Sequence, residues 1–180
     1  MGKSRNTTRV IVPCRFAYVC CFRPGTQFGG TQKYSISAVI SKDDVETIKK
    51  VEEAIEYVKE KGIEKWGGRI PNKFYVPLHD GDEKKPDNPI YRNSFYINAK
   101  SKEAPQVVDK NVLPIVDQTE VYSGCYGNVS IVFYPYSYGG SKGIAAWLGN
   151  IQKISDGEPF GGRILAKDEF LPVDKEDFLE

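Results

Sequence analysis

The 180-residue chain is 40% hydrophobic and 12% aromatic and carries a formal net charge of +1. This length and composition exclude a disordered chain and predict one folded domain with a sizeable core. No apolar run approaches the roughly 20 residues that span a bilayer as a helix, and no segment has the layout of a signal peptide, so we expect a cytoplasmic protein.

Metal and redox chemistry have few candidate ligands in this sequence. The cysteines are Cys14, Cys20, Cys21 and Cys125, without a C-x-x-C pair, and His79 is the sole histidine. A structural zinc site needs four such ligands close together. We therefore expect no metal and no cofactor, and we expect the thiols to be reduced and buried.

The first predicted strand covers residues 9–23, where apolar and polar residues alternate with period two. The expected core-facing set is Val10, Val12, Cys14, Phe16, Tyr18 and Cys20, and the opposite set is Arg9, Arg15 and Arg23. Pro13 lacks an N–H, which places this strand at an edge or bends it there. The basic row is either solvated surface or a track for phosphate groups.

A second strand, residues 33–40, leads into a predicted helix over about 42–61. Ser41 and Asp44 fit a capping box at its start, and Gly62 is a natural stop. The helix carries one apolar stripe, formed by Val45, Ile48, Val51, Ile55 and Val58. We expect this helix to cover the core and to carry no chemistry.

Residues 62–90 are predicted to be irregular, and residues 91–100 form the next strand. Its expected core-facing residues are Tyr91, Phe95, Ile97 and Ala99, and its outward set is Arg92, Tyr96, Asn98 and Lys100. Cations and a ring therefore share the outward face of this strand.

The most strongly patterned stretch is residues 121–154. Its core-facing parity contains Cys125, Val129, Ile131 and Phe133, whereas Tyr126, Tyr134, Tyr136 and Tyr138 occupy the other parity. Gly139-Gly140 supplies a turn, and Lys142 follows it. The periodicity of residues 142–154 fits either a helix or a strand, and the neighbouring glycines and the preceding turn favour a strand.

Short strands, Gly/Pro turns and one long helix predict a mainly β (α+β) fold, a small closed or nearly closed barrel with an inserted helix. A row of tyrosines facing away from the core has two interpretations. It is either aromatic cross-strand packing or a covered second core, or it is a platform on which unpaired bases stack. Recurrence of Arg, Lys, Tyr and Asn on the outward parity of three strands favours the platform.

Charge is distributed unevenly. Residues 167–180 contain six carboxylates and two lysines, a net charge of −4, which leaves +5 on the rest of the chain. A basic body with an acidic end suggests a polyanionic partner and a tail that competes with it, although an ordinary soluble terminus would have the same composition.

These features resemble the bacteriophage single-stranded DNA-binding proteins of the T-odd podophage type. The resemblance is carried by the early basic strand, by KYSISAVI running into a long helix, by YINAKSKEAPQVVD, by EVYSGCYGNVSIVFYPYSYGGSKGIAAWLGNIQKI, and by the acidic tail holding Phe178. It implies an OB-fold DNA-binding domain over residues 1–166 and a tail over 167–180. It also implies sequence-tolerant ssDNA binding in phage replication, recombination and strand annealing, in the host bacterial cytoplasm. The resemblance further implies a homodimer, and contacts from the tail to the replicative polymerase and primase–helicase.

Tyr136 matches the tyrosine that contributes to DNA binding in that family, and the resemblance also assigns residues 142–154 to a strand. The residues that we expect to contact ssDNA are Arg15, Lys33, Arg92, Tyr96, Lys100, Tyr126, Tyr134, Tyr136 and Lys142. The expected partner-binding residues of the tail are Asp174, Glu176, Asp177 and Phe178.

Two other functional classes compete with this interpretation. A phage structural or assembly protein would use the tyrosine-rich face as a protein interface. An enzyme such as a two-metal nuclease would need clustered acids, and the acids here are spread over a loop, a helix face and the tail. We therefore expect no enzymatic activity.

Overall fold

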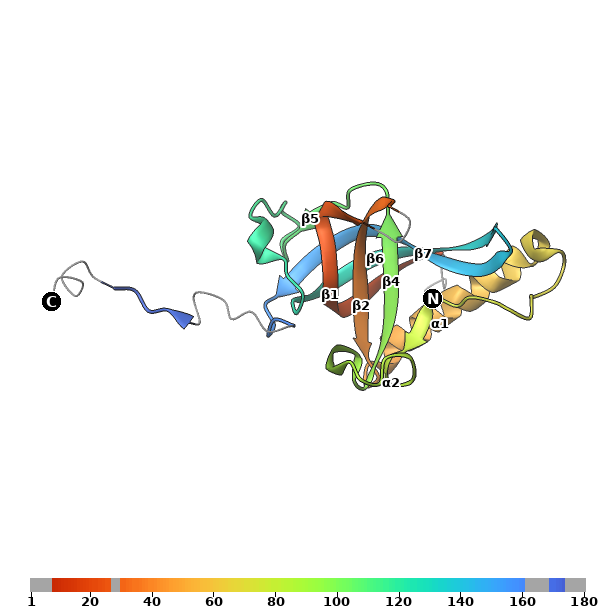
Figure 1. The fold of residues 1–180 in the computed structure, drawn as a ribbon, viewed down its shortest axis with the longest axis horizontal. Coiled ribbons are helices and arrows are strands. Elements are labelled where there is room, and N and C mark those ends of the chain that lie inside the picture. The colour runs from red at the N-terminus through yellow and green to blue at the C-terminus, as the bar shows by residue number, and fades with distance from the viewer. Residues whose placement is uncertain (1–7, 27–29, 161–168, 174–180) are drawn as a thin grey trace, which may run out of the picture.

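Five strands close a barrel in the computed structural model, which describes residues 8–26, 30–160 and 169–173 (Figure 1). The barrel strands are β1 (Arg9–Thr26), β2 (Gln32–Ser41), β4 (Ser94–Ser101), β6 (Tyr126–Tyr138) and β7 (Ser141–Ser155). Neighbours pair antiparallel in the order β4-β2-β1-β6-β7, and a parallel pairing of Lys100 with Trp147 joins β4 to β7 and closes the ring. The predicted mainly β barrel is confirmed.

Two short strands extend the sheet beyond the barrel. β3 (Leu78–Asp80) pairs with the first half of β4, and β5 (Val107–Val108) pairs with β7. The remaining short elements are α2 (Gly81–Lys84) and the 3-10 turns η1 (Ile63–Trp66), η2 (Pro89–Tyr91) and η3 (Gln118–Glu120).

The barrel interior is filled by the apolar parity of each strand, as the period-two patterns predict. Phe16 of β1, Ile97 of β4 and Phe133 of β6 each have an exposed fraction of 1% or less. Residues 142–154, whose periodicity fitted either a helix or a strand, lie in strand β7. This strand pairs with β6 from Tyr138–Ser141 to Tyr126–Ser155.

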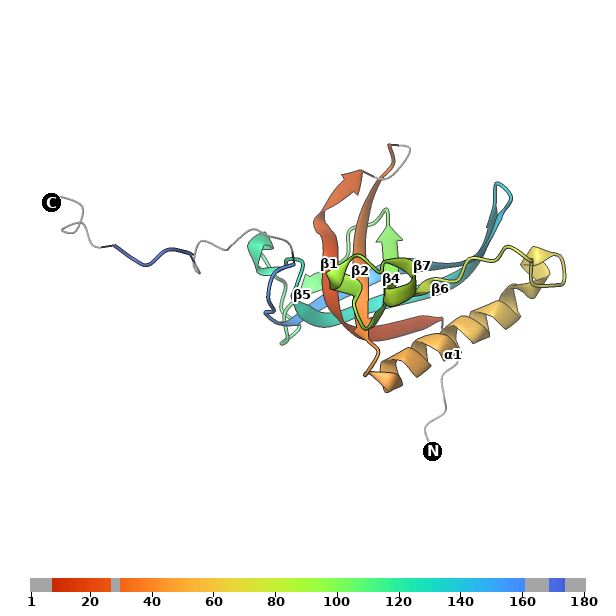
Figure 2. The same ribbon diagram turned by 60° about the horizontal axis from the view of Figure 1, so that its bottom comes forward.

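The long helix α1 (Val45–Gly62) begins three residues later than the sequence predicted, because its N-cap is Asp44, which accepts a hydrogen bond from Thr47 N (3.2 Å). Its buried stripe includes Val51, Ile55 and Val58. Figure 2 shows α1 running beside the barrel toward the end of the β6–β7 hairpin. Among the described helices, none is long and apolar enough to cross a membrane.

Two tyrosines that the sequence pattern assigned to the core lie outside the barrel. Tyr18 lies at a β-bulge, where the pairing of β1 with β2 shifts between Ala17 and Cys20, so the alternation reverses and Cys21 is buried in place of Cys20. Tyr91 lies in η2, before β4 begins, and packs with Ala17, Val39 and Tyr96 in a second apolar cluster on the outer face of the sheet.

Candidate nucleic-acid interface

Six rings form a continuous row over the outer face of the barrel. In spatial order they are Tyr18, Tyr91, Tyr96, His79, Tyr75 and Tyr136, and we call them the aromatic row. Successive ring centroids are separated by 6.3, 4.3, 5.0, 5.5 and 6.5 Å. Spacings of this size are those of tilted and offset aromatic pairs in direct contact.

The row crosses the part of the barrel between two hairpins. Tyr18 lies in the middle of β1, at its bulge, Tyr96 lies on β4, and Tyr136 lies on β6 near the β6–β7 turn. In OB-folds, oligonucleotides bind over the second and third barrel strands, between the loops that join strands 1 and 2 and strands 4 and 5. Here those strands are β2 and β4, so the aromatic row lies in that position.

Backbone pairing fixes the middle of the row. His79 is paired with Tyr96 through the β3–β4 ladder. Tyr75 forms a bridge to the hairpin strand, because its N–H donates to Lys142 O (3.0 Å) and its carbonyl accepts from Ile144 N (2.9 Å). Gly143 allows this approach, since a Cβ there would lie 2.4 Å from Tyr75 O. The backbone positions of Tyr75, His79 and Tyr96 are therefore set by main-chain contacts.

Exposure divides the row into a floor and a stacking surface. Tyr91 and Tyr96 are each only 4% exposed, and the Tyr91 hydroxyl donates to Ser37 Oγ (3.0 Å). Tyr18 is 56% exposed and Tyr75 is 42% exposed. The exposed rings can stack against a ligand; Tyr18 packs against the buried ring of Tyr91, and Tyr75 packs against His79 and Tyr136.

Electrostatics keep the centre of the row neutral at pH 7. Burial lowers the pKa of His79, and Lys84 and Lys85 lower it further. Burial also raises the pKa of Tyr75, with smaller contributions from Tyr136 and Tyr96. The Tyr75 hydroxyl and His79 Nε2 lie 3.0 Å apart, within hydrogen-bonding distance.

Four lysines surround the aromatic row, and we call them the groove lysines. Lys33 and Lys100 occupy the outward parity of β2 and β4, and Lys84 and Lys85 follow β3 in and after α2. None of the four forms an ion pair with another described residue. Unpaired cations beside stacked rings match the two chemical demands of a single strand, one for its phosphates and one for its bases.

A charged junction holds α2 next to the row. Lys42 Nζ, at the end of β2, lies 2.9 Å from Asp80 Oδ1 and 2.8 Å from Asp82 Oδ2. Asp82 also accepts from Asn93 N (3.0 Å), and hydrogen bonds to Lys42 hold the pKa of both carboxyls below their usual range. Gly81 packs closely against Tyr91, in the segment before β4. A Cβ at this position would lie only 2.3 Å from Tyr91 O.

The structure brings the sequence-predicted residues to three places rather than one. Lys33, Tyr96 and Lys100 lie on the β2–β4 face, with Tyr96 in the floor. Tyr136 joins the row from the hairpin, and Tyr134 shares its parity on β6 and is 43% exposed. Lys142 is paired with Ser137, so it lies on the opposite face of the hairpin from Tyr136, in a cavity of about 450 Å³ beside Trp66 and Arg69.

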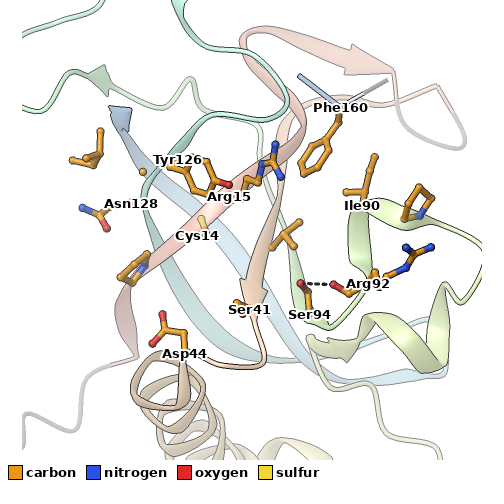
Figure 3. A pocket seen from close by; sticks show the side chains of 15 residues that line it. Cys14, Arg15, Ser41, Asp44, Ile90, Arg92, Ser94, Tyr126, Asn128 and Phe160 are labelled. Atoms are coloured by element: carbon orange, nitrogen blue, oxygen red, sulfur yellow. Dashed lines mark hydrogen bonds between the residues drawn. The ribbon is translucent and has the colours of Figure 1, made fainter. Parts of the chain in front are cut away.

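The third of these places is a separate cavity of about 640 Å³, which is lined by Arg15, Arg92 and Tyr126 (Figure 3). The Arg15 guanidinium donates to the carbonyls of Gly124 and Glu158. It also lies 5.1 Å from the Tyr126 ring centroid and 4.0 Å from that of Phe160. These contacts fasten the segment after β7 to β1 and leave Arg15 less free to bind phosphate than the groove lysines.

The tail residues Asp174, Glu176, Asp177 and Phe178 lie outside the described residues. In the described ranges, no group of three or more His, Cys, Asp or Glu side chains is placed to hold a metal ion.

Sequence reasoning missed four members of the row: Tyr18, Tyr75, His79 and Tyr91. They come from a bulge, an isolated bridge, a three-residue strand and a 3-10 turn, none of which has a periodic pattern long enough to recognise. The signal that was available is compositional, since residues 73–98 contain five aromatic side chains and the sole histidine beside several lysines.

A family model described as the ssDNA-binding protein of Enterobacter phage Enc34 matches residues 7–179. Protein p50 of Acyrthosiphon pisum secondary endosymbiont phage 1 is 34% identical over 168 residues, covering 87% of this chain and 88% of p50. The structure of the phage Enc34 single-stranded DNA-binding protein in complex with ssDNA matches with a TM-score of 0.75 and 28% identity, over 89% of this chain and 97% of that one. Bacteriophage T7 gp2.5, also a single-stranded DNA-binding protein, shares the fold, with a TM-score of 0.60 and 16% identity over 92% and 93% of the two chains.

Proposed function

The chain belongs to the family of the Enterobacter phage Enc34 ssDNA-binding protein, and from this premise we propose that it binds single-stranded DNA along the aromatic row. The family membership confirms the resemblance to phage ssDNA-binding proteins seen in the sequence. The observation that carries the proposal for this chain is the row itself: six rings in contact, at the oligonucleotide-binding position of an OB barrel, bordered by four lysines that form no ion pair with another described residue.

The exposed rings supply affinity that does not depend on sequence. Each base stacked on an aromatic side chain contributes about 1–3 kcal/mol, and every base has a face to stack. Tyr18 and Tyr75 offer exposed rings, and Tyr136 extends the surface onto the hairpin. The groove lysines neutralise the phosphates that follow the bases along the row.

Our proposal includes a non-enzymatic role in phage DNA replication, recombination and strand annealing in the bacterial cytoplasm. It assigns DNA binding to residues 1–166 and regulation to the acidic residues 167–180. The resemblance supports a homodimer and contacts from the tail to the replicative polymerase and primase–helicase.

Fluorescence anisotropy of labelled oligothymidine titrated with the protein tests the DNA-binding proposal. We expect micromolar or tighter binding at low salt and weaker binding of a duplex of the same length. If all four groove lysines contact phosphates, the slope of log K against log salt approaches about −3, since each contact on a single strand contributes about −0.7. Failure to bind oligothymidine at low salt would refute the proposal.

A further inference from the structure

The backbone at Tyr18 adopts a conformation that residues other than glycine rarely take. Its φ is +50°, in the left-handed region, and it lies at the bulge between Ala17 and Cys20. Strained residues of this kind concentrate at binding sites, and bulges serve to redirect a side chain. Here the bulge turns a tyrosine out of the core parity and onto the outer face.

Two contacts hold the redirected ring in place. The Tyr18 hydroxyl accepts a hydrogen bond from Asn88 Nδ2 (3.1 Å), and Asn88 Oδ1 in turn accepts from Ile90 N (3.1 Å). The ring also lies 6.3 Å from that of Tyr91, tilted by 31°. Tyr18 is nevertheless 56% exposed, so the ring is oriented by its neighbours without being covered by them.

A cavity of about 300 Å³ opens beside this ring, and we call it the Tyr18 pocket. Lys85 and Asn88 line one side, and Asn98 and Lys100 of β4 line the other. Asn98 is exposed, and neither lysine forms an ion pair with a described residue. The pocket therefore combines an oriented ring, a free amide and two unpaired cations in a space at the small end of the ligand-pocket range.

We propose that the Tyr18 pocket takes one unpaired base, stacked on Tyr18 with its edge toward the Asn98 amide, while Lys85 and Lys100 bind the adjoining phosphates. This inference rests on the proposed ssDNA binding and deepens it, because it assigns one position at which base identity is read. Stacking alone tolerates every base, whereas an amide has a donor and an acceptor that distinguish base edges. The protein then has a preference at one nucleotide within an otherwise sequence-tolerant site.

Two substitutions at the bulge separate the role of the ring from the strain in the backbone. Tyr18→Ala and Tyr18→Gly should both weaken oligothymidine binding by about 5- to 150-fold, the loss expected for one base–aromatic stack. Tyr18→Gly should melt at a higher temperature than Tyr18→Ala, because glycine adopts a positive φ without strain. Tyr57→Ala is the matched control, since Tyr57 lies on α1 and outside the row; wild-type affinity in both Tyr18 variants would overturn the proposal.

Photocrosslinking of the unmodified protein locates the base directly. An oligothymidine with 5-iodouracil at one internal position should crosslink to Tyr18, as identified by mass spectrometry of the peptides. Base preference is measured as the ratio between the affinities for the most tightly and the most weakly bound homo-oligonucleotides. Asn98→Ala should reduce this ratio and leave the salt slope unchanged. Crosslinks to Tyr75 or Tyr136 without Tyr18 would overturn the Tyr18 pocket and leave ssDNA binding standing, whereas absence of any oligonucleotide binding would overturn both.

Discussion

Tyr75→Ala is the most direct perturbation of the aromatic row, because Tyr75 joins the rings on the barrel to Tyr136 on the β6–β7 hairpin. The ring is 42% exposed, lies 5.5 Å from His79 and 6.5 Å from Tyr136, and its removal interrupts the stacking surface between them. The main-chain bonds of Tyr75 to Lys142 and Ile144 do not depend on the side chain. The variant should therefore stay folded but lose about 1–3 kcal/mol of stability, because the buried part of the ring is removed together with the hydroxyl contact with His79.

Loss of one base stack corresponds to about 1–3 kcal/mol of binding free energy, or a roughly 5- to 150-fold weaker Kd. Because no cation is removed, the salt slope should match that of the wild type. Fluorescence anisotropy with oligothymidine at several salt concentrations measures both quantities, and circular dichroism checks the fold.

Tyr75→Phe is the matched variant, since it keeps the ring and removes only the hydroxyl that contacts His79. It should retain most of the affinity. The reasoning is refuted if Tyr75→Ala binds as tightly as the wild type, or if Tyr75→Phe loses as much affinity as Tyr75→Ala.

Three further predictions concern pH, packing and the tail. The pKa of His79 is lowered on folding, so the unfolded chain binds its proton more readily; the melting temperature should fall as pH drops below about 6.5, and less so in His79→Gln. Equal pH dependence in the two proteins would contradict this. Gly127→Ala should destabilise the protein by about 1–3 kcal/mol in chemical denaturation, because a Cβ there would lie 2.0 Å from Gln152 O and 2.6 Å from the Phe16 ring; an unchanged midpoint would show that the barrel relaxes locally. Deletion of residues 167–180, which carry a net charge of −4, should tighten oligothymidine binding at low salt; unchanged or weaker binding would argue against a competing tail.

The barrel could be predicted from the sequence because its strands obey a simple rule over long stretches. Phe16, Ile97 and Phe133 are buried, as their parity required. The sequence left open whether the barrel closes fully, because closure depends on a single parallel pairing, of Lys100 with Trp147, between residues more than 40 positions apart in the chain. The start of α1 was misplaced because Ser41 and Asp44 are both good caps; in the structure Asp44 caps the helix, and Ser41 Oγ accepts from Asp43 N before the helix begins.

The candidate site was predicted in chemistry but only partly in position, and the reason is physical. Alternation identifies which face of a strand a residue occupies, but it does not say whether a loop later covers that face. Tyr96 has the outward parity and is nevertheless 4% exposed, because Tyr91 packs on it at 4.3 Å. Tyr91 and Tyr96 therefore pack in a covered cluster, while the exposed rings of Tyr18 and Tyr75 are the ones that we propose to stack on bases. The buried Tyr91 ring lies 6.3 Å from the exposed Tyr18 ring and restricts its motion, which lowers the entropy that Tyr18 would lose on binding. In our proposal the outer face of the barrel combines aromatic packing with base recognition, the two roles that the sequence pattern presented as alternatives for the tyrosines of β6.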